Sequence, residues 1–379
     1  MRRIDAIEPF RVMQLLERAR ELEAAGRDIV HMEIGEPDFA APDRVAEAAH
    51  RAIEEGHDRY TPSTGLAQLK VALSEWYRRE HRVSVAPERI LITPGASGAF
   101  MALYLALVEN GESVLLPDPG YPCQRNFVRL VGGEPISIPV GPDTRYHLDA
   151  EAIGRHWRPD TRAAVVTAPG NPTGTLIGRA ELNALAGACR DRGGVLISDE
   201  IYHGLTYGEA AISALEVDDD VVVVNGFSKR WAMTGWRVGW MVVPERLIDP
   251  CRRVMQNIFI AATTVSQYAA LAALEADDQV AEMVAAYDKR RRFLLDALPK
   301  LGFQIPVAPQ GAFYVYAGTS GLTDDAPAFC RDLLEQRGVA ITPGADFGSH
   351  QAARHVRFSY ATGMGRLREG VRRIAAFLP

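Results

Sequence analysis

The chain has 379 residues, of which 47% are hydrophobic and 24% charged, proportions that are ordinary for a globular protein with a large core. The formal net charge of −6 argues against a surface that binds nucleic acid or an anionic membrane. Its four cysteines are widely scattered with no CxxC pair, which favours a reducing compartment and no zinc site.

The first ten residues, MRRIDAIEPF, start basic, but Asp5, Glu8 and Pro9 interrupt them before an apolar signal-peptide core forms. No charge-free apolar run approaches membrane-spanning length. The motifs HExxH, GxSxG, Walker A and GxGxxG do not occur, so the common signatures of zincins, serine hydrolases and nucleotide binders are missing. We therefore expect a cytoplasmic protein that is not a zincin, a serine hydrolase or a nucleotide-binding protein of these common types.

Residues 11–25 and 42–55 show helical spacing and end at or before a glycine, which predicts two helices. From about 66 to 250, helical segments alternate with short apolar runs. The strand candidates are RILIT (89–93), SVLLP (113–117), EPISI (134–138), AAVVTA (163–168), GVLIS (194–198), VVVVN (221–225) and RVGWMVV (237–243). This alternation predicts an α/β domain with a mostly parallel, seven-stranded sheet covered by helices on both faces.

The pattern changes after a predicted long helix at 277–299. FQIPV (303–307), AFYVYA (312–317), VAIT (339–342) and HVRFSYA (355–361), with helices at 326–337 and 365–378, indicate a smaller α+β domain. We predict a large domain over 47–285 and a small domain made of 1–46 and 286–379.

Polar side chains follow four of the predicted strands. Ser97 lies in a glycine-rich turn, PGASGAF, which opens a helix, and Asn171 lies in PGNPTG. Asp199 and Tyr202 belong to DEIY, and Lys229 ends GFSK. Ligands of open α/β sheets bind beyond the carboxyl ends of the strands, so we expect these groups at one crevice.

This set of groups suits pyridoxal 5'-phosphate. That cofactor needs a lysine for its aldehyde, a carboxylate for its ring nitrogen, donors for its phenolate oxygen and a cradle for its phosphate. A helix N-terminus with small residues, as at Ser97, holds phosphate well.

At these residues the sequence resembles the fold type I aminotransferases of class I/II, the group of aspartate, aromatic and alanine aminotransferases. SKRWAMTGWRVG (228–239) is similar to the lysine signature of that family, with lysine and arginine eight residues apart. GEPDF (35–39), YTPSTGLAQL (60–69), PGNPTG (169–174), DEIY (199–202) and VRFSYA (356–361) match its other landmarks in order. The match covers nearly the whole chain.

The resemblance implies an enzyme that moves an amino group from an L-amino acid to a 2-oxo acid in a ping-pong cycle. Lys229 is expected to form the aldimine with pyridoxal phosphate and to move the substrate proton. Asp199 is expected to pair with the pyridine N–H, while Tyr202 and Asn171 donate to the phenolate oxygen.

The resemblance also implies the remaining contacts. Those expected at the cofactor phosphate are Arg237, Ser97, the Ala96 N–H, Ser228 and, from a second subunit, Tyr60. Tyr121 is expected to stack on the pyridine ring. Arg357 is expected to hold the substrate α-carboxylate by a planar two-point contact, beside Gly35 and Asn171. The Tyr60 assignment predicts a homodimer with shared sites.

Two positions qualify this correspondence. Some relatives carry a serine three residues before the lysine, whereas this chain has Gly226, so the phosphate contacts are expected to depend more on Ser97 and on backbone groups. His203, beside Tyr202, is interpreted as a packing or supporting residue because Lys229 already supplies the base.

Two alternative functions remain open from the sequence. A carbon–sulfur β-lyase uses the same cofactor and nearly the same motifs. A non-catalytic regulator on the same fold is a weaker alternative, because such regulators carry a DNA-binding domain ahead of the fold, which here begins within the first thirty residues.

Substrate preference is predicted from the segments expected to border the side-chain pocket. These are the stretch that ends in Phe10, and QNIFIAATT (256–264), which contains no lysine or arginine. Arg11 remains a candidate cation. Because an unpaired carboxylate in an apolar pocket costs several kcal/mol, we predict a neutral amino donor, with 2-oxoglutarate or pyruvate as acceptor.

Overall fold

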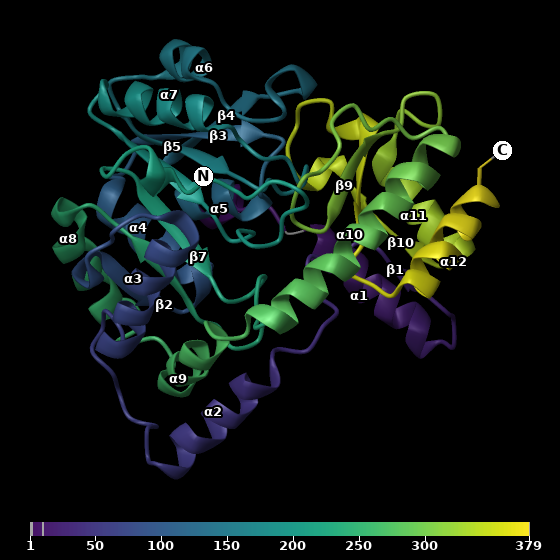
Figure 1. Ribbon diagram of the computed structural model, residues 1–379. Helices are drawn as coiled ribbons and strands as arrows, with labels where there is room; N and C mark the ends of the chain where they lie inside the picture. The colour runs from purple at the N-terminus through teal and green to yellow at the C-terminus, as the bar shows by residue number, and fades with distance from the viewer. Residues whose placement is uncertain (1–2, 10, 379) are drawn as a thin grey trace.

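The computed structural model describes residues 3–9 and 11–378. Figure 1 shows two bodies side by side, a larger one built on a broad sheet and a smaller one near the C-terminus, joined by the long helix α10 (Asp277–Lys300). Among the residues described, no helix is both long enough and apolar enough to cross a membrane.

The larger body contains the predicted seven-stranded sheet. The strands lie in the order β2 (Ile90–Thr93), β8 (Gly239–Val242), β7 (Val222–Gly226), β6 (Val195–Asp199), β5 (Thr161–Thr167), β3 (Ser113–Asp118) and β4 (Glu134–Pro139). Strand β8 is antiparallel to both of its neighbours, and the remaining pairs are parallel. The α/β class and the mostly parallel sheet are therefore confirmed.

Helices cover both faces of this sheet, which is why its central strands are apolar along their whole length. The helices of this body are α2 (Asp43–Glu54), α3 (Ala67–His81), α4 (Gly95–Leu107), α5 (Pro122–Leu130), α6 (Ala150–His156), α7 (Arg179–Arg190), α8 (Glu245–Ile258) and α9 (Thr264–Ala273). One buried cluster includes Trp76 and Trp240, and a separate one includes Leu103 and Met255. The sheet thus lies between two apolar layers.

The smaller body is a short antiparallel sheet with helices packed against it. Strand β12 (His355–Ser359) pairs with β9 (Tyr314–Gly318) on one side and with β11 (Thr342–Pro343) on the other. Strand β1 (Val30–His31) pairs with β10 (Val339–Ala340), and the helices are α1 (Arg11–Ala24), α11 (Ala326–Arg337) and α12 (Met364–Ala375). The N-terminal and C-terminal segments therefore share this body.

Two expectations need comment at this level. FQIPV does not form a strand; only Gln304 bridges to Gly318, and Pro306 has no N–H to donate to a ladder. Both predicted domain boundaries fall inside helices: the one at residue 285 lies within α10, which is continuous from Asp277 to Lys300, and the one at residue 46 lies within α2 of the larger body.

Candidate active site

A cavity of about 450 Å³ lies at the carboxyl ends of β5, β6 and β7 and is closed by residues of the smaller body. Its lining contains all but one of the predicted site residues: Gly35, Ala96, Ser97, Tyr121, Asn171, Asp199, Tyr202, Ser228, Lys229, Arg237 and Arg357. The exception is Tyr60. Segments that are more than 300 residues apart in the chain, as Gly35 and Arg357 are, thus meet at one place.

Lys229 follows strand β7 and donates a hydrogen bond from Nζ to the carbonyl oxygen of Gly35 at 2.6 Å. Burial lowers the pKa of its amine to about 8, and the guanidinium groups of Arg357 and Arg237 act in the same direction, against Glu36. A larger fraction of this amine is neutral near pH 7 than of an ordinary lysine, so it is a better nucleophile and base.

Asp199 is the last residue of β6, and its side chain is only 3% exposed. Its Oδ1 accepts a hydrogen bond from the Ile201 N–H at 3.3 Å. Burial raises the pKa of this carboxyl to about 7, against the smaller opposing effects of the Ile201 N–H, the Gln124 side chain and the charge of Lys229. A cationic group of a ligand placed beside this buried carboxyl would stabilise its ionised form and form an ion pair with it.

The start of helix α4 and Arg237 form an anion cradle. Helix α4 begins at Gly95, and the residue before it, Pro94, provides no side-chain cap, so the first N–H groups are available to a ligand. The guanidinium of Arg237 lies at this helix start, because a Cβ added to Gly95 would be 2.8 Å from its Nη2. Arg237 adopts a left-handed backbone conformation, with φ of 49°, that few non-glycine residues adopt.

Strand β8 can pass close to this cradle because it begins with a glycine. A Cβ added to Gly239 would lie 2.9 Å from the Ala96 nitrogen. Gly226, where some relatives have serine, is similarly enclosed, since its added Cβ would lie 3.2 Å from Ile201 Cδ1. Gly226 does not line the cavity, so this position provides no substitute for the serine hydroxyl that contacts the phosphate in some relatives.

Asn171, Tyr202 and Tyr314 contribute a group of polar side chains to the cavity lining. The hydroxyl groups of Tyr202 and Tyr314 are hydrogen-bonded at 2.8 Å, and the Oδ1 of Asn171 accepts from Arg357 at 2.9 Å. Gly35 permits close approach here, since a Cβ would be 2.5 Å from the Tyr314 oxygen.

Arg357 is held rigidly at the middle of β12. Its Nη2 donates to the Glu33 carbonyl oxygen at 2.5 Å, and its guanidinium lies 4.2 Å from the ring centroid of Tyr314. Its Nε is buried and has no hydrogen-bond partner in the described chain. The group is therefore oriented but not neutralised, as a receptor for a carboxylate should be.

Sequence reasoning missed several residues that line the cavity. These are Tyr314, Thr167, Thr234, Glu36, Ile34, Ile201, Phe100 and the α1 residues Val12, Met13, Leu16 and Arg20. The signal for α1 was present, because Val12, Met13, Leu16 and Arg20 recur at helical spacing. No residue of 256–264 lines this cavity, and Phe10 lies outside the described residues.

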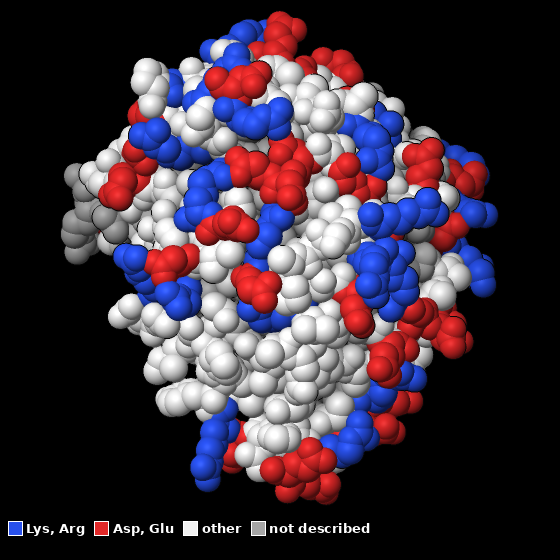
Figure 2. Space-filling model, turned by 60° about the vertical axis from the view of Figure 1, so that its left-hand side comes forward, with Lys and Arg blue, Asp and Glu red and all other residues white. Residues whose placement is uncertain are grey.

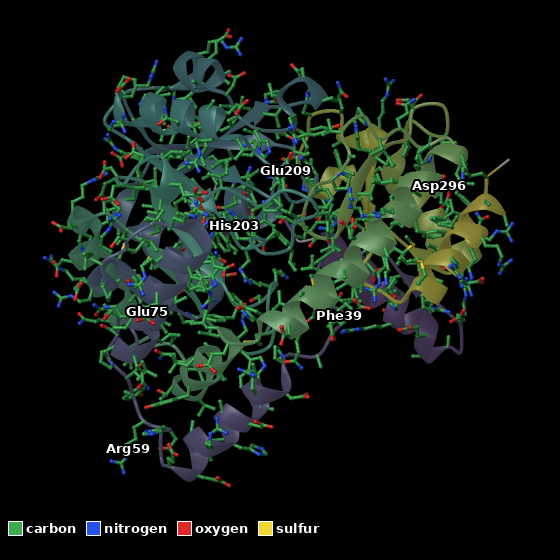
Figure 3. All side chains as sticks on the ribbon, viewed as in Figure 1. Phe39, Arg59, Glu75, His203, Glu209 and Asp296 are labelled. Carbon is green, nitrogen blue, oxygen red and sulfur yellow. The ribbon has the colours of Figure 1, made fainter. Side chains whose placement is uncertain are left out.

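Tyr60 lies away from the cavity and is 80% exposed. It belongs to the segment that joins α2 to α3, where Figure 3 shows its neighbour Arg59 pointing away from the body of the protein. The Arg59 carbonyl oxygen accepts a hydrogen bond from Thr264 at 2.6 Å, which places this segment beside the start of α9.

These groups fit pyridoxal phosphate. The unpaired Asp199 carboxylate matches a protonated ring nitrogen, and the Lys229 amine matches an aldehyde. The Gly95 turn with Arg237 matches a phosphate, and the oriented Arg357 guanidinium in the cavity lining matches a substrate carboxylate.

Comparison with known proteins gives a consistent result. Residues 27–374 match the family model described as aminotransferase class I and II. The chain is 39% identical to a valine–pyruvate aminotransferase of Mycobacterium tuberculosis, over 98% of this chain and 97% of that protein. It is 37% identical to an aspartate/prephenate aminotransferase of Thermus thermophilus, over 100% and 98% of the two chains. A crystal structure of an aminotransferase from M. tuberculosis superposes with a TM-score of 0.95, 39% identity, and coverage of 100% and 98%.

Proposed function

The chain belongs to the class I and II aminotransferases and is a transaminase, and we propose that the cavity around Lys229 is where it binds pyridoxal phosphate and both of its substrates. The observation that carries this proposal is the meeting of a low-pKa lysine, a buried unpaired carboxylate and an oriented arginine in one cavity. The relatives are named as aminotransferases, so the alternatives of a β-lyase and a regulator are not favoured.

Pyridoxal phosphate, when bound, supplies an aldehyde that reacts with amines and a ring that withdraws electrons from the carbon being deprotonated. Lys229 is the proposed covalent attachment point, and its amine then removes and returns the substrate proton. Asp199 holds the ring nitrogen in its protonated form, because a carboxylate beside it stabilises the cation.

The other cavity residues orient the reactants. In our proposal the N–H groups of Ala96 and Ser97, the hydroxyls of Ser97 and Ser228, and Arg237 hold the phosphate. Tyr202 and Asn171 donate to the ring oxygen, and Tyr121 lies against the ring face. Lys229, the one lysine among the described residues that lines the cavity, would supply the amine that acts on the substrate.

Substrate binding is proposed to depend on Arg357. Its guanidinium lines the cavity, and a planar guanidinium offers pairs of N–H donors that a carboxylate accepts in two parallel hydrogen bonds. Gly35 and Asn171 lie beside this carboxylate, and the hydrogen bond from Arg357 to Asn171 couples the substrate contact to the cofactor contact.

The side-chain pocket supports a neutral amino donor. Helix α1 presents Val12, Met13 and Leu16 to the cavity, and Ile34 lies beside them. The relative named valine–pyruvate aminotransferase is consistent with this preference. Arg20 lines the same cavity, so we propose that it binds the distal carboxylate of 2-oxoglutarate and of the glutamate formed from it, while the apolar lining binds the side chain of the neutral donor.

We further propose a homodimer in which Tyr60 of each chain reaches the phosphate site of the other. Tyr60, Ile258 and Ile260 are exposed by 80%, 51% and 49%, and the contact of Arg59 with Thr264 brings their segments together. This face borders the phosphate cradle, because a Cβ added to Gly98 would lie 3.6 Å from the Phe259 ring. Figure 2 shows a broad area with few charged side chains on one face of the protein, of the kind that a second copy covers.

The domain division and the location of the protein are also proposed. The large domain is taken as 47–285, and 1–46 with 286–379 as the small domain, so that the cavity lies between them. A cytoplasmic location is supported by four free cysteines, three of which are buried thiols.

A half-reaction screen tests this function. The holoenzyme is mixed with single L-amino acids, and loss of its visible absorbance is followed together with the product of each amino acid. We expect 2-oxo acids from leucine, methionine, phenylalanine or alanine, in preference to aspartate. Pyruvate and ammonia formed from a sulfur-substituted amino acid, with no 2-oxo acid of unchanged skeleton from any donor, would instead indicate the β-lyase. Arg20→Ala should lower kcat/KM for 2-oxoglutarate but not for pyruvate.

A further inference from the structure

A buried acid and a buried imidazole face each other behind the cavity wall. Glu200 follows Asp199 but does not line the cavity, and its Oε1 accepts hydrogen bonds from Ser198 at 3.1 Å, Ser213 at 3.1 Å and the Ala214 N–H at 2.8 Å. Its Oε2 lies 3.4 Å from His203 Nδ1. Both of these atoms are buried, and neither has a hydrogen-bond partner in the described chain. Figure 3 shows His203 deep within the larger body.

The other nitrogen of His203 identifies its tautomer. Nε2 lies 3.0 Å from the carbonyl oxygen of Ala168. A carbonyl oxygen can only accept, so Nε2 carries a hydrogen. If Nε2 carries the hydrogen, Nδ1 of the neutral ring is an acceptor, and so is an ionised Glu200 Oε2. The two acceptors would then face each other without a hydrogen bond unless one proton lies between them. A single proton satisfies both atoms, and leaving them bare would carry the cost of two buried unsatisfied groups.

The surroundings decide which atom carries that proton. The charged and titratable groups that face the pair are Tyr77 and His81 of α3, with His81 paired to Glu216, and Arg230 of the loop after β7. Burial raises the pKa of the Glu200 carboxyl and lowers the pKa of the His203 imidazole, because each charged form loses its hydration. Both directions place the proton on Glu200, so that each side chain is uncharged, whereas a proton on His203 would bury a separated pair of charges.

We propose that Glu200 and His203 share one proton, carried on Glu200, and that His203 is a positioning residue that fixes the loop presenting Asn171. The Nε2–H of His203 holds the Ala168 carbonyl, and the loop from 168 to 175 is closed by Gly170 N–H donating to the Thr175 carbonyl at 3.0 Å. Asn171 in this loop accepts from Arg357. The consequence for substrate binding rests on the proposed function, whereas the protonation state does not.

The protonation state is tested by nitrogen-15 NMR of the holoenzyme labelled at histidine, with His203→Gln used to assign the signals of His203 among the nine histidines. We expect His203 to have a protonated Nε2 and an unprotonated Nδ1, with no titration between pH 6 and 8. Glu200→Gln, whose amide also donates to Nδ1, should keep this tautomer. A doubly protonated ring, or a ring protonated at Nδ1 alone, would overturn the proposal.

The positioning role is tested with two amides of different reach. The side-chain nitrogen of Gln can replace Nε2 of histidine, while that of Asn reaches only the place of Nδ1. We therefore expect His203→Asn to raise the KM for the amino acid roughly tenfold, equivalent to about 1.4 kcal/mol, with little change in kcat. His203→Gln should restore most of this loss.

Circular dichroism and Tm verify that both variants fold. Equal KM values for His203→Asn and His203→Gln would contradict a positioning role. If the wild-type enzyme transaminates no pair of substrates, the proposed function fails, and the NMR result still decides the shared proton.

Discussion

At the scale of single residues, the cavity buries a basic group, the Lys229 amine, and an acidic group, the Asp199 carboxyl, and burial shifts their pKa values in opposite directions. Burial lowers the pKa of the Lys229 amine to about 8 and raises that of the Asp199 carboxyl to about 7, so both are held close to the pH at which they change charge. The sequence predicted both residues, because each follows an apolar strand of a parallel sheet. It did not reveal Tyr314, since a tyrosine within AFYVYA is indistinguishable from a core residue.

The first prediction concerns the pH dependence of cofactor attachment at Lys229. With a pKa of about 8, about a tenth of this amine is neutral at pH 7, against fewer than about one in a thousand for an ordinary lysine. The rate at which pyridoxal phosphate attaches to the cofactor-free protein should rise roughly tenfold from pH 6 to 7 and level off above pH 8. Stopped-flow absorbance measures this rate, with a free lysine derivative as the control. A rate that still rises tenfold between pH 9 and 10 would contradict the lowered pKa.

The second prediction concerns the stability of the cofactor-free protein at Asp199. Its pKa in the folded state, about 7, is above the unfolded value of about 3.9, so ionisation opposes folding at pH 8 and opposes it less as the pH falls through 7. Asp199→Asn should therefore raise the free energy of unfolding at pH 8 by up to about 4 kcal/mol, and by less than half as much at pH 5.

The same substitution should weaken cofactor binding, so its two effects have opposite signs. Urea unfolding at both pH values measures the first effect, and cofactor titration measures the second. Asp143→Asn, at an exposed position, is the matched control and should change neither. A less stable cofactor-free Asp199→Asn protein at pH 8 would show that the carboxylate is not an isolated buried charge.

At the scale of elements, the site depends on how closely strand β8 passes the start of helix α4. The sequence predicted strand β8 to within two residues at each end, from its apolar run, and it predicted the start of α4 to within two residues, from the glycine-rich turn before it. Their separation was not predictable, since it depends on Gly239 meeting Ala96, and a glycine in a strand has several explanations. The inward face of α1 was missed for a related reason, because periodicity shows that a face is buried but not what it covers.

The third prediction tests this close approach. Gly239→Ala places a methyl group 2.9 Å from the Ala96 nitrogen, so strand and helix must separate and the phosphate cradle widens. We expect the dissociation constant of pyridoxal phosphate to rise at least tenfold and the free energy of unfolding to fall by about 1–3 kcal/mol.

Gly235→Ala, in the loop that precedes β8, is the control, because nothing lies within 4 Å of its added Cβ. Isothermal titration with the cofactor compares the two variants. If Gly239→Ala binds the cofactor as tightly as Gly235→Ala does, the cradle does not depend on this contact.

At the scale of the whole molecule, the described chain brings every predicted site residue except Tyr60 to the cavity. The absence of Tyr60 from the cavity of its own chain agrees with the expectation that Tyr60 contacts the cofactor phosphate of a second subunit. Two-fold symmetry would place the exposed segments around Tyr60 and Ile260 of one protomer against those of its partner. The domain boundary is less accessible to sequence reasoning, because helix α10 continues through it without a change in composition.

The fourth prediction tests whether sites are shared between subunits. Tyr60→Ala alone should weaken cofactor retention, and Lys229→Ala alone should abolish turnover. When the two inactive or weakened chains are mixed and allowed to exchange, the hybrid dimer contains one site with an intact Lys229 and an intact partner tyrosine. Activity and cofactor retention should therefore recover toward those of one wild-type site per dimer. Absence of recovery, with hybrids verified by mass spectrometry, would place Tyr60 outside the site.

The central claim, that Lys229 carries the cofactor in this cavity, is tested most directly by borohydride reduction of the holoenzyme followed by peptide mapping. The chain has four lysines, at 70, 229, 289 and 300, and only Lys229 lines the cavity. We predict one phosphopyridoxyl group per chain on the peptide that contains Lys229, and none in the Lys229→Ala variant. Stoichiometric labelling at Lys70, Lys289 or Lys300 instead would contradict the account.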